Sequence, residues 1–121
     1  MSRRFEPLRP LAGSITVEVE GDRRVLCLQG DIDSAVVARF TAEYAPELPL
    51  IDVIDAGDVS FMSSTGLAVM LRCSQAAVAA GGERPVLRSE SPAVRYLLKQ
   101  SGLDSALRRQ PPTAGGLPSA P

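Results

Sequence analysis

Polar and apolar residues alternate along the first regular segment of the chain, which runs from Ile15 to Glu20. A two-residue period of this kind predicts a half-buried strand. Gly21-Asp22 then supplies a turn, and the run 25–28 that follows is apolar on both faces, as in a strand inside a sheet. The pattern therefore predicts a hairpin whose second strand lies in the interior of a sheet.

The spacing of the apolar residues changes to that of a helix after residue 30. Residues 30–34 break the strand and offer several helix-capping side chains, and the helical pattern that follows ends before Pro46. Residues 50–55 form a second apolar run of strand length, and residues 56–62 are expected to be a loop. This order of strand, helix and strand predicts parallel pairing through a right-handed crossover.

Two further helices are predicted in the remaining half of the chain. The run from Leu67 to Ala80 contains no helix breaker and predicts the longest helix. Residues 85–88 form a short strand, and Ser91-Pro92 opens another helix, which Gly102 ends. A last apolar turn at residues 103–107 is expected to pack on the sheet.

These elements add up to one α/β domain. Its sheet is mixed, because the opening hairpin is antiparallel while the later strands pair in parallel. We place the domain at residues 14–108, after a proline- and arginine-rich irregular arm at residues 1–13. Residues 109–121 are too rich in proline, glycine and alanine to hold a core and are predicted to be a disordered tail. From a length of 121 residues we expect a single domain in this sequence.

The charge of the chain argues against two classes of partner. A net charge of -1 and a pI of about 5.4 give no general attraction for phosphate backbones or anionic lipids, so neither nucleic acid nor a membrane is an expected partner. The segment Met1–Phe5 superficially resembles a twin-arginine export signal, but Pro7 and Pro10 follow it and an apolar segment does not. We therefore expect the protein to stay in the cytoplasm and to bind a protein or a small molecule.

Missing residue types exclude much of enzyme chemistry. The chain has no histidine, so it has no Ser-His-Asp or Cys-His pair and no usual zinc or iron site. Its one lysine, Lys99, lies in a predicted helix rather than in a phosphate-binding loop. Asp31 and Asp33 lack a third metal ligand. Cys27 and Cys73 lack the close spacing of a metal or redox pair, so the two cysteines are expected to be buried thiols. We predict no enzyme activity, no metal and no cofactor.

Three consecutive hydroxyl residues, Ser63, Ser64 and Thr65, stand directly before the longest predicted helix. One of them is enough to cap the helix, a contact worth about 1 kcal/mol. Alternatively, one hydroxyl accepts a phosphate, because free amides and the helix dipole favour negative charge at this end. The residues leave both interpretations open, and the apolar pair Phe61-Met62 just before them either exposes a contact surface or packs under the helix.

Several segments resemble, in their order and spacing, the STAS domain of bacterial anti-sigma factor antagonists. The likeness extends from about Ile15 to Leu107, nearly the whole predicted domain. Its segments are Gly30-Asp31-Ile32-Asp33, Ile51–Asp55, Val59–Leu71, Ser91–Leu98 and Ser101–Leu103. The resemblance implies the STAS fold, a mixed sheet of four to five strands with helices mostly on one face.

The resemblance also implies a partner-switching role without catalysis. In this family the unmodified antagonist binds a serine-kinase anti-sigma factor, which then releases its sigma factor for transcription. The kinase switches the antagonist off by phosphorylating a serine that corresponds to Ser64, with Thr65 as the second choice, and a separate serine phosphatase reverses the step. Asp33 matches the acidic residue usually found near that serine.

One position departs from the family pattern, in which an aspartate precedes the modified serine. That position is Ser63 in this chain. Serine still caps a helix, but it places no carboxylate beside the hydroxyl, so recognition by the kinase or transfer to Ser64 is expected to weaken. Members of the fold that are never phosphorylated also exist. The alternative function is therefore a constitutive STAS accessory subunit of a transporter or signalling complex.

Neighbouring residues complete the predicted partner-binding site. Asp55 either accepts a hydrogen bond from Ser64 or caps the predicted loop, and we favour the loop role. Arg72 is either solvated or meets an acidic patch on the kinase, and Gly66 either admits a partner's backbone or seats the helix on the sheet. The predicted site consists of Asp31, Asp33, Asp55, Met62, Ser63, Ser64, Thr65, Gly66 and Arg72.

Overall fold

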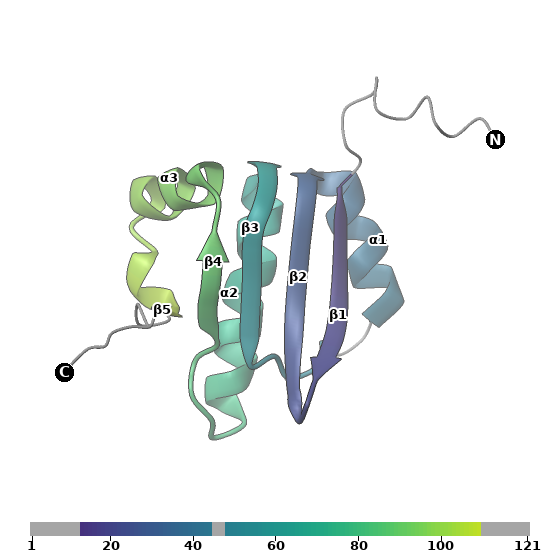
Figure 1. Cartoon of the computed structure of the whole chain (residues 1–121), viewed down its shortest axis with the longest axis vertical. Helices are drawn as coiled ribbons and strands as arrows, with labels where there is room; N and C mark the ends of the chain where they lie inside the picture. Colours follow the sequence, from purple (N-terminus) through teal and green to yellow (C-terminus); the bar gives the residue numbers. More distant parts are fainter. Residues whose placement is uncertain (1–12, 45–47, 110–121) are drawn as a thin grey trace.

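Five strands form one mixed sheet in the computed structural model, which describes residues 13–44 and 48–109 (Figure 1). β1 runs antiparallel to β2, and each later pair of neighbours is parallel. The predicted mixed sheet of four to five strands is therefore confirmed. In spatial order, the strands are β1 (Ser14–Glu20), β2 (Arg23–Ile32), β3 (Val53–Met62), β4 (Val86–Glu90) and β5 (Arg108–Arg109).

Two helices cover one face of the sheet. α1 (Ser34–Tyr44) and α2 (Ser64–Ala79) lie behind the strands in Figure 1, whereas α3 (Pro92–Ser101) lies at the upper end of β4. A short 3-10 turn (Asp104–Ala106) leads from α3 toward β5. Among the described residues no helix covers the opposite face, so the predicted arrangement with helices mostly on one face is confirmed.

The core lies between the sheet and these two helices. Leu26, Leu28 and Ile54 contribute to it from β2 and β3 and are at most 1% exposed. Phe40 of α1 and Met70 of α2 belong to the same buried cluster. Full burial of a side chain of this size stabilises the fold by about 1.5–3 kcal/mol. The core therefore holds the helices in fixed positions relative to the strands.

Two strands are longer than predicted. β2 continues to Ile32 and β3 to Met62, so the residues 56–62 that were expected to form a loop are part of the sheet. Gly30 adopts a positive φ of 73°, and the pairing of β2 with β3 shifts register beside it. A glycine tolerates this backbone conformation where other residues are strained, so the strand passes through the residues that appeared to end it.

The two cysteines lie in different environments. Cys73 is buried in α2 as predicted, and burial raises the pKa of its thiol to about 11. Cys27 is only half-buried, and it alternates with the core residues of β2, which places it on the helix-free face. Its predicted burial is therefore wrong in degree, although burial still raises the pKa of its thiol.

Some predictions concern the ends of the chain. The predicted arm, apart from Gly13, and the predicted tail from residue 110 onward lie outside the described residues. Over the residues with assigned positions, none of the helices is long and apolar enough to cross a bilayer. In the same residues, no group of three or more His, Cys, Asp or Glu side chains is placed to hold a metal ion.

Candidate docking site at the start of helix α2

The carboxyl ends of β2 and β3 bring the two halves of the candidate site together. Ile32 and Met62 are neighbours in the register of the sheet. Directly after them, the Ser63 amide donates a hydrogen bond of 2.9 Å to the Ile32 carbonyl. Asp31 and Asp33 therefore lie beside the hydroxyl residues at the start of α2, as the parallel pairing predicts.

Ser63 caps α2, and the helix begins earlier than predicted. Ser63 has an extended backbone (φ -81°, ψ 168°), and its Oγ accepts a hydrogen bond of 3.2 Å from the Gly66 amide. The Leu67 amide already bonds to the Ser63 carbonyl at 3.1 Å. The amides without an intrahelical acceptor are therefore those of the first turn, from Ser64 on.

The three neighbouring hydroxyls have different surroundings. Ser63 Oγ and Thr65 Oγ1 are 2.7 Å apart and share a hydrogen bond. Ser64 is the first residue of α2 and is exposed, and its hydroxyl has no partner among the side chains and backbone groups that the structure describes. Capping is thus complete without Ser64, which leaves this hydroxyl open to a reagent from solvent.

Asp31 and Asp33 each have a structural contact. Asp33 caps α1, because its Oδ1 accepts a hydrogen bond of 3.0 Å from the Val36 amide. Asp31 Oδ1 accepts a hydrogen bond of 2.9 Å from Ser60 Oγ and so joins β2 to β3. Both residues border the start of α2, but a cap and a strand contact explain their positions without a metal ion.

The pair Phe61-Met62 divides between surface and core. Met62 is 6% exposed and belongs to the core cluster, so its predicted contact with a partner is wrong. Phe61 is 51% exposed. Phe61 is not among the predicted site residues, because the sequence predicts a loop at residues 56–62 and leaves the exposure of the pair open. Strand alternation would have placed these two neighbours on opposite faces.

Gly66 seats α2 on the sheet. A Cβ atom at this position would lie 2.8 Å from Ile32 Cγ2 and 3.2 Å from Met62 Cγ. Both neighbours are in the core, so the close approach here is between the helix and the sheet. Of the two predicted roles, the structure supports the packing role.

Asp55 lies away from the start of α2. It is in the first half of β3, on the helix-free face, seven residues before Met62, which is about 20 Å along a strand. Partial burial opposes ionisation of Asp55, but hydrogen bonds from Ser89, the Gly57 amide and Arg88 outweigh it and hold the pKa of this carboxyl below its usual value. Asp55 was predicted to end a strand beside Ser64, and this prediction is wrong.

Arg72 is exposed on α2, two turns beyond Ser64. It lines a groove between α1 and α2, and none of the described carboxylates forms an ion pair with it. The predicted choice between a solvated residue and a contact for an acidic partner therefore stays open at this point.

Comparison with known proteins agrees with this arrangement. The family described as "Mlab, STAS domain" matches residues 15–109. The crystal structure of an anti-sigma factor antagonist from Mycobacterium paratuberculosis is similar, with 27% sequence identity and a TM-score of 0.59. The similarity covers 83% of this chain and 86% of that one. Among curated proteins, none matches the sequence.

Proposed function

Because this chain belongs to the STAS domain family, we propose that it is an anti-sigma factor antagonist whose binding is controlled by a phosphate on Ser64. One observation carries this proposal. Of three adjacent hydroxyls at the start of α2, only that of Ser64 is exposed and without a partner in the described part of the chain. The likeness to an anti-sigma factor antagonist supports the class of partner.

The position of Ser64 suits a reversible phosphate. A phosphate there carries about -1.5 to -2 charges at neutral pH and meets free amides and the positive end of the α2 dipole, so the fold tolerates it. A partner that covers the same spot would have to desolvate this charge. Modification therefore removes binding while the domain stays folded.

The proposed cycle needs two other proteins and no catalysis by this chain. A serine-kinase anti-sigma factor in the cytoplasm binds the unmodified form and releases its sigma factor, and the same kinase then phosphorylates Ser64. A serine phosphatase restores the binding form. The absence of histidine from the sequence supports a role as substrate and binding partner rather than as an enzyme.

Ser63 supports a second candidate function. Its hydroxyl, instead of the family's carboxylate, caps α2 and bonds to Thr65, so no acidic group adjoins Ser64 in sequence. If the chain is never phosphorylated, the surface at the start of α2 would bind its partner permanently. The chain would then act as an accessory subunit of a transporter or signalling complex.

Mapping the phosphate distinguishes the two candidates. The full chain is incubated with its serine kinase and ATP, and the peptides are analysed by mass spectrometry. We expect one phosphate, on Ser64, which Ser64→Ala abolishes and the matched variant Thr65→Val retains. Phosphate on none of the residues from Ser60 to Thr65 would favour the accessory subunit.

A further inference from the structure

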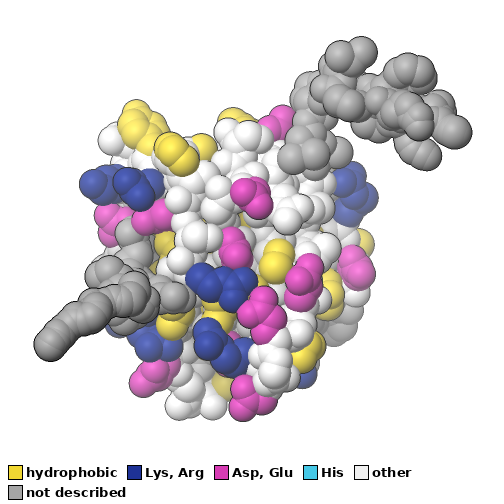
Figure 2. Space-filling model, viewed as in Figure 1, with side chains coloured by type: hydrophobic (Ala, Val, Ile, Leu, Met, Phe, Trp, Pro, Cys, Tyr) yellow, Lys and Arg dark blue, Asp and Glu magenta, His cyan; other side chains and the backbone are white. Residues whose placement is uncertain are grey.

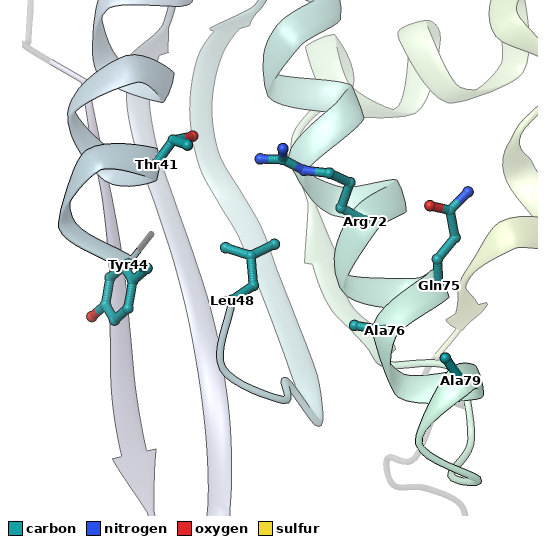
Figure 3. Close-up of a pocket in the computed structure, with 7 residues that line it drawn as sticks. All are labelled: Thr41, Tyr44, Leu48, Arg72, Gln75, Ala76 and Ala79. Carbon is teal, nitrogen blue, oxygen red and sulfur yellow. The ribbon is translucent and has the colours of Figure 1, made fainter. Parts of the chain in front are cut away.

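A groove of about 420 Å³ lies between α1 and α2 on the side away from the sheet (Figure 3). Figure 3 shows Thr41 and Tyr44 on the α1 side, Arg72 on the α2 side and Leu48 between the two helices. Gln75, Ala76 and Ala79 complete the α2 wall. Most of the lining is apolar or small, so the groove can receive side chains of another molecule.

Of the described residues that line this groove, Arg72 is the one that carries a charge. Its side chain extends from α2 toward α1 in Figure 3. Within residues 13–44 and 48–109 no carboxylate forms an ion pair with it, and its side chain is exposed. A cation beside an apolar lining is complementary to a segment that carries one acidic side chain among apolar ones.

The face of α2 that lines the groove continues to the start of the helix. Thr65, Ala68, Arg72, Ala76 and Ala79 follow one another at spacings of three or four residues, which places them on one face of the helix. All of them are at least partly exposed. Thr65 and Arg72 are about 10 Å apart along the axis. Because the intervening Ala68 is small, a partner helix can approach closely between them.

We propose that this groove binds an amphipathic helix of the anti-sigma factor and that Arg72 pairs with an acidic residue of that helix. The inference rests on the proposed function, since it extends the contact at Ser64 along α2. A helix that binds in a groove contacts it through residues three or four positions apart, and the exposed residues of α2 have the same spacing. The partner then contacts both Ser64, the position of the proposed phosphate, and the groove.

Charge reversal at Arg72 tests the pairing. Binding to the serine-kinase anti-sigma factor used for the phosphate mapping is measured by calorimetry for the unphosphorylated chain. We expect Arg72→Glu to weaken binding about tenfold or more and Arg72→Lys to keep most of it. The matched control is Arg39→Glu, which makes the same change on the side of α1 that faces β1. Equal effects of Arg72→Glu and Arg39→Glu would overturn the proposal.

Filling the groove provides a second test. Ala79→Trp places a ring in the groove, whereas Val78→Trp adds the same ring at a neighbouring exposed position that does not line it. We expect only Ala79→Trp to weaken binding, with unchanged circular dichroism for both variants. If Ser64→Asp weakens binding and the groove variants do not, this inference fails and the proposed function stands. Dissociation of a dimer of the free chain by Ala79→Trp would identify a second copy as the occupant and overturn the inference.

Discussion

At the scale of single residues, the structure separates roles that look equivalent in the sequence. The sequence shows three consecutive hydroxyl residues, Ser63, Ser64 and Thr65. Which of them caps α2 depends on the residue at which the helix begins, and that residue is Ser64. That start is fixed by the close packing of Gly66 on Ile32 and Met62. The sequence identifies the segment that holds the cap of α2, but it does not assign the cap to one residue, because the contacts of the sheet set the first helical residue.

Replacing Gly66 tests this packing. Gly66→Ala brings a Cβ to within 2.8 Å of Ile32 Cγ2 in a full core. Overpacking costs about 1–3 kcal/mol, and the better helix propensity of alanine offsets up to about 1 kcal/mol of this. We expect a net loss of about 1–2 kcal/mol in the free energy of unfolding, measured by urea denaturation. Gly82→Ala is the control, since its Cβ would meet only the Ala77 carbonyl at 3.4 Å.

The cap by Asp33 allows a second prediction at this scale. Asp33→Ala removes the acceptor of the Val36 amide at the start of α1, which costs about 1 kcal/mol. The same denaturation measurement checks it. Asp58→Ala, at an exposed position of β3, is expected to change the free energy of unfolding by less than about 0.5 kcal/mol. Equal losses in the two variants would contradict a capping role for Asp33.

At the scale of elements, Arg88 ties together strands that are not neighbours. From β4 it donates hydrogen bonds to Asp55 of β3 (3.0 Å) and to Glu20 of β1 (2.8 Å), so its side chain crosses β2 and β3. Figure 2 shows basic and acidic side chains together in the middle of this helix-free face. Val25 and Val53, on the same face, are fully buried. Long charged side chains can cover apolar surface in this way.

The pH dependence of stability tests this network. The Arg88 guanidinium lowers the pKa of Glu20, and hydrogen bonds lower that of Asp55 despite its partial burial. Carboxyls with a lowered folded-state pKa stabilise the fold above their unfolded values near pH 4, and this contribution disappears as pH falls through the folded values. We expect Arg88→Gln to cost up to about 1 kcal/mol at pH 7 and progressively less between pH 4 and 2.

Urea denaturation at several pH values would check this prediction. Arg84→Gln is the matched control, since Arg84 bonds to the Ser105 carbonyl and no described carboxylate pairs with it. Its effect should not vary over this pH range. A loss in Arg88→Gln that stays constant from pH 7 to pH 2 would show that packing of the side chain, rather than its charge, holds the strands.

The elements differ in how well their ends could be predicted. α3 follows local signals, since Ser91 caps it, Pro92 is its first residue and Gly102 ends it at φ 72°. The end of β3 does not follow local signals, because the second half of this strand contains glycine, aspartate and serine. This half becomes a strand only by pairing with β2. Pairing between distant segments overrides local preference. The same error placed Asp55 at a strand end and left open which of Phe61 and Met62 is exposed.

At the scale of the whole molecule, the two faces of the sheet have separate tasks. The helix-free face holds the strands together through Arg88, and the helical face carries the proposed contact surface from Ser64 to the groove. The order of the elements was predictable, and so was the meeting of Asp31 and Asp33 with the start of α2, because parallel strands direct their carboxyl ends to one edge. The groove was not predictable from the sequence, since it depends on how α1 and α2 pack against each other.

This separation predicts that charge at Ser64 affects binding and not folding. An anion in the first turn of α2 stabilises a helix by about 0.3–1 kcal/mol, so Ser64→Asp should unfold no faster than the neutral variant Ser64→Asn while it binds the anti-sigma factor more weakly. Cys73 provides the measurement, because its thiol is 1% exposed with a pKa of about 11 and reacts with alkylating reagents only when the core opens. Mass spectrometry distinguishes it from the half-buried Cys27. Faster labelling of Cys73 in Ser64→Asp would show that the charge acts by loosening the fold, and loss of binding would then be no evidence for a docking site.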